Sequence, residues 1–254
     1  MPRLNDTENN LEQHQARLGS YGFSATRMED LGASEYTLVT IAVDTSSSVS
    51  YFEKEMKDCL KEIVKSCQHS PRADNLMIRV TEFNSHLNEL HGFKLLQECN
   101  LDDYNDILNV GGMTALYDAS ENAISSTGSY GKKLMENDFQ VNGIVFVITD
   151  GDDNHSSLTP GIVKKAFSQV YKEESLESLI SILIGVNIQE PYISDRLASF
   201  NTEVGFNKYI ELGNASASTL AKLAEFVSKS ISSQSQSLGT GGASKDLLDG
   251  SLTI

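Results

Sequence analysis

Hydrophobic residues in this sequence gather into short continuous runs, and amphipathic stretches separate one run from the next. Two of the runs, Thr37–Val43 and Gly143–Ile148, are rich in Val and Ile and have the length of a single strand. Uninterrupted runs of this kind are typical of strands buried on both faces of a parallel sheet. In the intervening stretches, such as residues 50–68, apolar residues recur at helical spacing. The pattern therefore predicts an α/β fold with helices packed on a sheet.

The whole pattern predicts about six strands and six helices in a doubly wound, mostly parallel, Rossmann-like fold. The expected strands are residues 37–43, 76–83, 87–96, 143–149, 179–186 and 208–212. Asn84-Ser85 forms a tight turn between the second and third strands, which predicts one antiparallel strand at the edge of the sheet. The expected helices are residues 11–18, 50–68, 116–124, 159–171, 192–200 and 220–231. Ser50-Tyr51-Phe52-Glu53 has the form of a capping box at the start of the second helix.

Composition divides the chain into three parts. Residues 1–34 form a polar extension, and residues 35–231 carry the alternating pattern of a single domain. Residues 232–254 are rich in Ser, Gln and Gly, which predicts a flexible tail. Its last segment, Leu247–Ile254, is apolar again. We expect that segment to be an unstructured terminus or a short peptide that adds to a partner's sheet edge or groove.

Oxygen-bearing side chains stand where two of the apolar runs stop. Asp44-Thr45-Ser46-Ser47-Ser48 follows the first run, and Thr149-Asp150-Gly151-Asp152 ends the run that begins at Gly143. Thr114 stands between them in the sequence, behind Gly111-Gly112. In an open α/β sheet, the crevice beyond the carboxyl ends of the strands is the usual ligand site. The sequence therefore predicts one metal site built from Asp44, Ser46, Ser48, Thr114 and Asp150.

Two carboxylates and three hydroxyls offer only hard oxygen donors. Such donors suit Mg²⁺, Mn²⁺ or Ca²⁺ and suit zinc or copper poorly. Asp152, Asp153 and His155 follow closely and are expected at the rim of the site. We expect His155 to be an ordinary histidine of a surface loop. The alternative is that it contacts the rim of the site or acts as a general base.

With these segments placed, residues 35–231 resemble a von Willebrand factor A (vWA) domain. The metal-ion-dependent adhesion site of that family uses an Asp-x-Ser-x-Ser loop, a Thr from a later loop and an Asp after another strand. The resemblance implies that the hydroxyls of Ser46, Ser48 and, in some states, Thr114 touch the metal directly. It also implies that Asp44 and Asp150 bind directly or through water. One coordination position would stay open for an acidic residue of a partner protein.

The first loop departs from the commonest form of the family motif at two positions. Ser47 stands where Gly is frequent, and Val49 stands where Met is frequent. Neither position supplies a metal ligand in the family. We therefore expect the site to survive with a change in the stiffness of its loop.

Charge and composition exclude several classes of partner. The net charge is −15, and the 20 basic residues form no run, which argues against nucleic-acid binding and against anionic membrane surfaces. No stretch approaches about 18 consecutive apolar residues, and the first residues lack the apolar core of a signal peptide. We therefore expect a soluble cytoplasmic protein. Three cysteines without metal-ligand spacing predict reduced, packed thiols.

The favoured function is an intracellular, metal-dependent protein-binding module that belongs to a multiprotein assembly. The signatures G-x-S-x-G, G-x-x-x-x-G-K-[ST] and H-E-x-x-H are absent from the sequence, so no enzyme is expected. One alternative is a metal-assisted hydrolase or phosphotransfer enzyme, although Ser46 stands where a dehalogenase-type phosphatase would need its second Asp. The other is a structural component that forms homo- or hetero-oligomers through its C-terminal tail.

Overall fold

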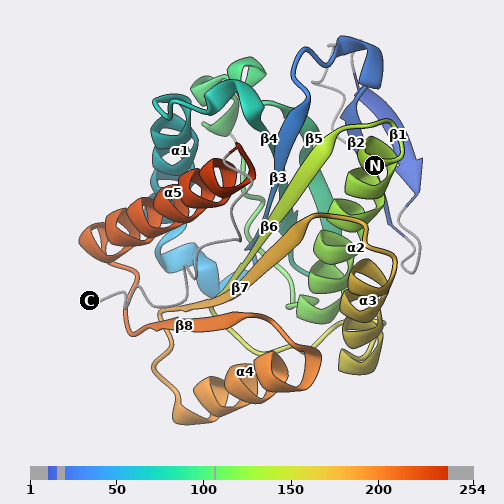
Figure 1. The fold of residues 1–254 in the computed structure, drawn as a ribbon. Helices are drawn as coiled ribbons and strands as arrows, with labels where there is room; N and C mark the ends of the chain where they lie inside the picture. Colours follow the sequence, from blue (N-terminus) through green and yellow to red (C-terminus); the bar gives the residue numbers. More distant parts are fainter. Residues whose placement is uncertain (1–10, 16–20, 106, 240–254) are drawn as a thin grey trace.

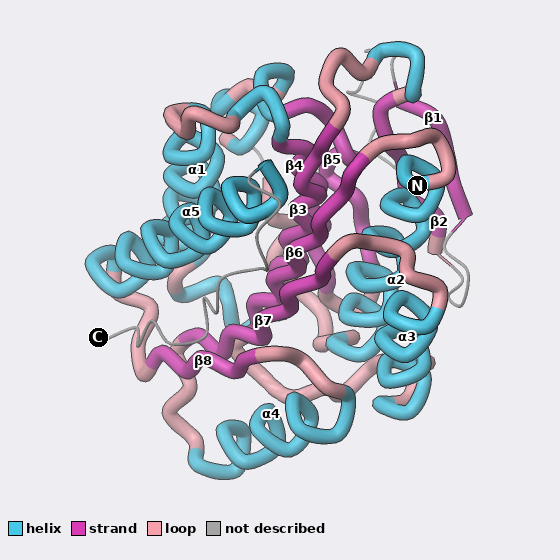
Figure 2. The backbone as a smooth tube through the Cα atoms, in the orientation of Figure 1, coloured by secondary structure: helices cyan, strands magenta, loops and turns pink. Residues whose placement is uncertain are grey.

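The computed structural model describes residues 11–15, 21–105 and 107–239. These residues form an eight-stranded sheet with helices on both faces (Figures 1 and 2). The strands are β1 (Leu11–Gln15), β2 (Gly22–Thr26), β3 (Glu35–Asp44), β4 (Leu76–Phe83), β5 (Leu87–Leu95), β6 (Gln140–Thr149), β7 (Ser178–Val186) and β8 (Lys208–Leu212). The α-helices are α1 (Glu53–Gln68), α2 (Leu116–Met135), α3 (Pro160–Lys172), α4 (Pro191–Val204) and α5 (Ala217–Gly239).

The order of strands across the sheet is β1-β2-β5-β4-β3-β6-β7-β8. The run from β4 through β3, β6 and β7 to β8 is parallel. β5 pairs with β4 in the antiparallel sense, and this is the hairpin predicted from Asn84-Ser85. The predicted α/β fold with a mostly parallel sheet is therefore confirmed. The six predicted strands are all present, and β1 and β2 are two additional strands that extend the sheet beyond β5.

The prediction of a helix at residues 11–18 is wrong, because Leu11–Gln15 forms the strand β1. β1 pairs with β2 over five residues, from Leu11 opposite Thr26 to Gln15 opposite Gly22. The ring of His14 stacks on Phe23 with their centroids 5.1 Å apart. Five residues are too few for periodicity to separate a strand from a helix turn, and here tertiary pairing decides. Residues 16–18 lie outside the described structure.

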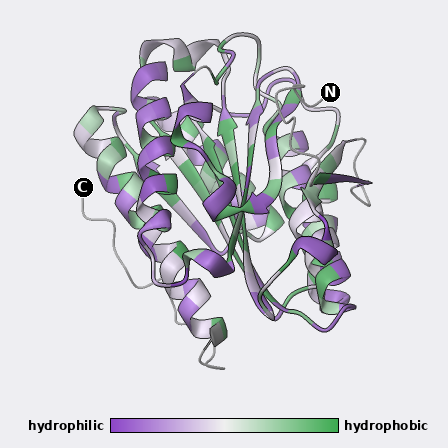
Figure 3. Ribbon diagram, turned by 90° about the horizontal axis from the view of Figure 1, so that it is seen from above, coloured by the Kyte–Doolittle hydropathy of each residue, from purple (hydrophilic) through white to green (hydrophobic). Residues whose placement is uncertain are grey.

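Two hydrophobic cores lie on opposite faces of the sheet. Side chains of α1 and α5 fill the core on one face, and side chains of α2, α3 and α4 fill the other. Along β3, Val39 and Ile41 point into the first core, whereas Leu38 and Ala42 point into the second, as the period of two in a strand requires. Figure 3 shows the apolar strands between the helical layers. The three cysteines are free and buried, as predicted.

Helix α5 is longer than the sequence indicated. It runs on to Gly239, so the predicted tail from Ser232 begins inside a helix. The side-chain amide of Gln234 donates to Ser178 Oγ at 2.7 Å, and the backbone carbonyl of Gln234 accepts from Asn142 Nδ2 at 3.1 Å. Polar contacts hold this end of the helix on the sheet, and a hydrophobic pattern cannot reveal them. Residues 240–254 lie outside the described structure, so the rest of the tail prediction stays a prediction. Among the described residues, no helix is both long and apolar enough to cross a bilayer.

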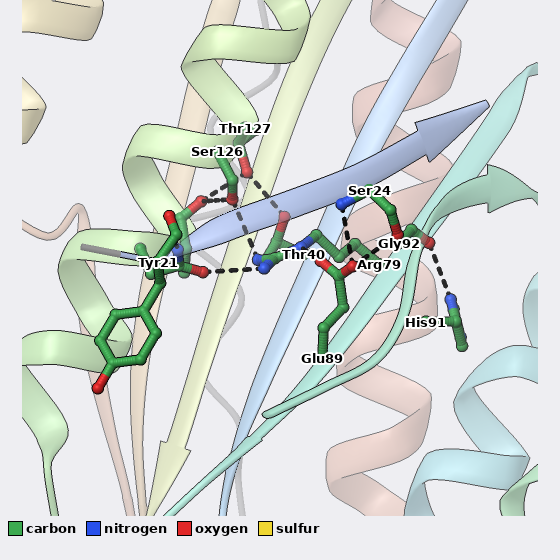
Figure 4. Close-up of polar contacts among 11 residues, drawn as sticks. Tyr21, Ser24, Thr40, Arg79, Glu89, His91, Gly92, Ser126 and Thr127 are labelled. Carbon is green, nitrogen blue, oxygen red and sulfur yellow. Dashed lines mark hydrogen bonds and ion pairs between the residues drawn. The ribbon is translucent and has the colours of Figure 1, made fainter. Parts of the chain in front are cut away.

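A buried ion pair fastens the β1–β2 hairpin to the sheet (Figure 4). Arg79 on β4 is only 1% exposed, and its Nε donates to Glu89 Oε2 on β5 at 2.6 Å. The terminal nitrogens of Arg79 donate to Ser126 and Asn122 of α2. The other carboxylate oxygen of Glu89 accepts from the backbone N and the Oγ of Ser24 on β2. One charged pair thus joins β2, β4, β5 and α2.

We predict that Glu89→Gln lowers the free energy of unfolding by about 3 kcal/mol, because Arg79 then stays buried without its counter-charge. Urea unfolding followed by circular dichroism measures the effect. The matched control is Glu225→Gln, which removes the exposed partner of Lys229 and should change stability by less than about 0.5 kcal/mol. Equal effects of the two substitutions would contradict the assignment.

Candidate metal site

The two predicted acidic ligands lie at the same edge of the sheet. β3 and β6 are neighbours, and their parallel register places Val43 opposite Ile148. Asp44, the last residue of β3, and Asp150, the residue after β6, therefore lie at the carboxyl ends of adjacent strands. Chain order also reverses here, because β4 lies on one side of β3 and β6 lies on the other. This is the switch point at which open α/β sheets bind ligands.

The serine hydroxyls of the first loop converge on Asp150. Ser48 Oγ donates to Asp150 Oδ1 at 2.9 Å, and Ser46 Oγ lies 3.5 Å from the same oxygen. The two serine oxygens are 3.1 Å apart. Asp44 is tied to both loops, since Oδ1 accepts from the backbone N of Ser46 at 2.7 Å and Oδ2 accepts from Thr149 Oγ1 at 2.6 Å. Four of the five predicted residues thus form one connected cluster.

A short 3₁₀ helix, η2 (Ser47–Tyr51), sets the directions of the serine side chains. Ser46 and Ser48 turn toward Asp150, whereas the Oγ of Ser47 donates to the carbonyl of Gly112 at 3.0 Å. The predicted capping box is absent, because α1 begins at Glu53 and Ser50 Oγ donates to the carbonyl of Ser47 instead. The first loop therefore needs an extra turn of 3₁₀ helix before α1.

Thr114 is buried in the adjoining loop and is held through its backbone. Its N donates to Asn154 Oδ1 at 2.7 Å, and its carbonyl accepts from the backbone N of Asn154 and of His155. Within the described residues, the Thr114 hydroxyl makes no hydrogen bond to the other four predicted ligands. The structure thus ties Thr114 to the loop that carries Asp150. The sequence did not single out Asn154, because no local pattern predicts its hydrogen bond to Thr114, which lies 40 residues away.

The loop before Thr114 depends on glycine. Gly112 has a φ of +82°, and a Cβ there would lie 2.8 Å from Ser85 Oγ. The carbonyl of Gly112 accepts from the backbone N of Ser47 at 3.2 Å, and the N of Gly111 donates to the carbonyl of Thr45 at 2.8 Å. The three loops that carry the predicted ligands are therefore joined by backbone hydrogen bonds.

The predicted rim residues have partners of their own. Asp152 Oδ2 accepts from Arg196 Nε at 2.7 Å. Asp153 accepts from Ser156 Oγ and from the backbone N of Tyr117, near the start of α2. His155 is exposed, and its backbone N donates to the carbonyl of Thr114. The described side-chain partners of Asp152 and Asp153 are thus residues outside the five predicted ligands.

The two carboxyl groups share a buried and electrostatically unfavourable position. Burial raises the pKa of Asp44 from 3.8 to about 7, and the charge of Asp150 adds to the rise. Burial also raises the pKa of Asp150. A cation between the loops would relieve both effects. Within the described residues, no three His, Cys, Asp or Glu side chains gather around a common point. An ion here would therefore rely on hydroxyls beside the two carboxylates, and the donor set fits a hard cation.

We predict that Asp44→Asn stabilises the metal-free protein at neutral and higher pH. Because folding raises the pKa of Asp44 from 3.8 to about 7, ionisation of its carboxyl opposes folding as the pH rises through that window. Above pH 7 the asparagine should add roughly 2 to 4 kcal/mol. The amide can donate to Thr149 Oγ1, whose hydroxyl also lies 2.9 Å from the carbonyl of Gly151.

Thermal unfolding in chelator at about pH 4 and pH 8 measures this effect. The gain should be present at pH 8 and small at pH 4. The control is Asp58→Asn, which alters an exposed pair with Lys54 and should shift both midpoints little. A loss of stability at pH 8 in Asp44→Asn would contradict the electrostatic account.

Known structures share this fold. The PilB minor pilin from Streptococcus sanguinis is 15% identical, with a TM-score of 0.58 over 87% of this chain and 66% of that chain. Proximal thread matrix protein 1 from the mussel byssus is 20% identical, with a TM-score of 0.56 over 78% and 47%. The pilus adhesin SpaC from Lactobacillus rhamnosus GG is 9% identical, with a TM-score of 0.60 over 88% and 33%. This chain spans less than two-thirds of the length of each, and the likeness concerns the fold alone.

No curated protein matches the sequence. The sequence model of the von Willebrand factor type A domain matches residues 39–171, which is a little over half of the chain and includes both loops that begin with Asp44 and Asp150. The chain belongs to the von Willebrand factor type A domain family.

Proposed function

We propose that this protein binds an acidic residue of a partner protein through a divalent cation held by Asp44, Ser46, Ser48, Thr114 and Asp150. Membership of the vWA family indicates a protein-interaction module. The observation that carries the metal-dependent part is the convergence of the hydroxyls of Ser46 and Ser48 on Asp150 Oδ1. We propose Mg²⁺ as the cation, and the same donors would accept Mn²⁺ or Ca²⁺.

The hydrogen bonds of Asp44 favour a cation that keeps residual charge. Both carboxylate oxygens of Asp44 already accept hydrogen bonds, from Ser46 and from Thr149. Asp150 is then the carboxylate best placed for direct contact, beside the neutral hydroxyls of Ser46 and Ser48. A divalent ion with few direct carboxylates stays positive and attracts an external carboxylate.

Exposed apolar side chains around the site support a protein partner. Tyr51 at the end of η2 is 91% exposed, and Met113, which precedes Thr114, is 46% exposed. Tyr192 is 66% exposed and lies one turn before Arg196, the partner of Asp152. These are three of the four large apolar side chains that are exposed in the described part of the chain. Aromatic residues and Met are enriched in protein interfaces.

A cytoplasmic location and assembly through the C-terminal tail remain predictions from the sequence. The apolar terminal segment lies within residues 240–254, outside the described structure. No contact described above favours the hydrolase or phosphotransfer alternative, so the binding module is the function we propose.

We predict that Asp150→Ala abolishes calorimetric binding of Mg²⁺ and Mn²⁺ while the fold stays intact, because the residue lies in a loop beyond β6. Asp44→Ala should act in the same way. The control is Asp58→Ala on the exposed surface of α1, which should bind both ions as the wild type does. Identical binding by wild type and Asp150→Ala would remove the site assignment.

We predict that the immobilised protein captures its partner in Mg²⁺, releases it in chelator and recaptures it when Mg²⁺ is restored. Asp150→Ala should capture nothing. Tyr51→Ser should keep its metal affinity and lose about tenfold in partner affinity, since a large exposed ring near the centre of an interface contributes strongly. Capture that is unaffected by chelator would place the interface on another face.

A further inference from the structure

The loop after β6 contains more carboxylates than the proposed site uses. Asp150 accepts a hydrogen bond from the hydroxyl of Ser48, and Asp152 lies two residues further along the chain. Calcium-binding loops place successive carboxylates on one ion with this alternating spacing. By this spacing, Asp152 is a carboxylate of the protein itself that can compete for the coordination position meant for a partner.

The structure holds Asp152 elsewhere. Its Oδ2 accepts from Arg196 Nε at 2.7 Å, and its side chain is only 16% exposed. The next carboxylate, Asp153, is bound to Ser156 Oγ and to the backbone N of Tyr117. Both spare carboxylates of the loop are thus engaged by groups outside the proposed metal site.

Arg196 is carried by a well-packed helix. The neighbouring residue Leu197 is fully buried, and Phe200 and Val204 continue the same buried face of α4. The ring of Phe200 lies 4.8 Å from that of Tyr117 at the start of α2. The guanidinium therefore approaches the loop from a fixed element, which makes the ion pair with Asp152 a defined contact and reduces the entropy lost on forming it.

We propose that Arg196 is a positioning residue that keeps Asp152 off the bound cation and so preserves an open coordination position for a partner's carboxylate. The inference rests on the proposed metal site. If Asp152 joined Asp150 on the ion, the ion would bind more tightly and keep less positive charge for an external acid. Arg196 thus lowers metal affinity and maintains the capacity to bind a partner.

Two measurements on the intact chain with Mn²⁺ alone test the proposal. Arg196→Gln should raise Mn²⁺ affinity about fivefold in calorimetry, because Asp152 is released from a pair of modest strength. Water proton relaxation should show that the bound Mn²⁺ has lost an inner-sphere water, since Asp152 replaces it. Arg196→Lys keeps the positive charge and should stay closer to the wild type in both measurements.

Variants of Asp152 separate positioning from a merely structural role. Asp152→Asn alone should leave the inner-sphere hydration of the bound Mn²⁺ at the wild-type value, because the wild-type Asp152 is not a ligand. The double variant Arg196→Gln, Asp152→Asn should also return to wild-type values. Thermal unfolding in chelator would show that each variant is folded.

The outcomes distinguish failure of this proposal from failure of the metal site. Unchanged Mn²⁺ affinity and hydration in Arg196→Gln would overturn the role of Arg196, while loss of binding in Asp150→Ala would still support the site. A gain of an inner-sphere water on the bound Mn²⁺ in Asp152→Asn would identify Asp152 as a ligand and would likewise overturn the role of Arg196. Failure of the wild type to bind Mn²⁺ would overturn both proposals.

Discussion

The parallel pairing of β3 with β6 is the interaction on which the candidate site depends. Its register brings Asp44 and Asp150 to the same edge, although 105 residues separate Asp44 from its hydrogen-bond donor Thr149. Both strands are buried on two faces, so a slip of one residue would move every side chain to the wrong core. Backbone hydrogen bonds between the loops at this edge then hold their oxygen-bearing side chains close together.

The protein contains two buried charged centres that are arranged in opposite ways. Arg79 and Glu89 neutralise each other, and hydroxyl, amide and backbone groups around them complete the network. Asp44 and Asp150 bring two like charges together, and burial raises the pKa of both. The first centre is neutralised within the chain, whereas an added positive charge would offset the like charges of the second. Such a local conflict is expected where structure serves binding rather than stability.

Sequence reasoning succeeded where the signal was local. Buried strands such as β3 and β6 were evident from their continuous apolar runs, and the oxygen-rich loops followed directly from the ends of those strands. It failed where contacts between distant polar groups decide the structure. β1 is short and polar, so it carries no hydrophobic pattern. The end of α5 is held by a hydrogen bond from Gln234 to Ser178 of β7, which a hydrophobic pattern cannot reveal. The hydrogen-bonded ion pair of Arg196 with Asp152 joins residues 44 positions apart, so neither local spacing nor composition can predict it.

The edges of the sheet have a consequence for self-association. An outer strand presents unpaired backbone groups that can join another copy of the same chain and seed aggregation. Here the outermost strands, β1 and β8, are each only five residues long. Glu12, Gln13 and Gln15 make β1 polar, and Lys208 begins β8. Short borders of this kind, one of them polar along its length, discourage growth of the sheet from one molecule into the next.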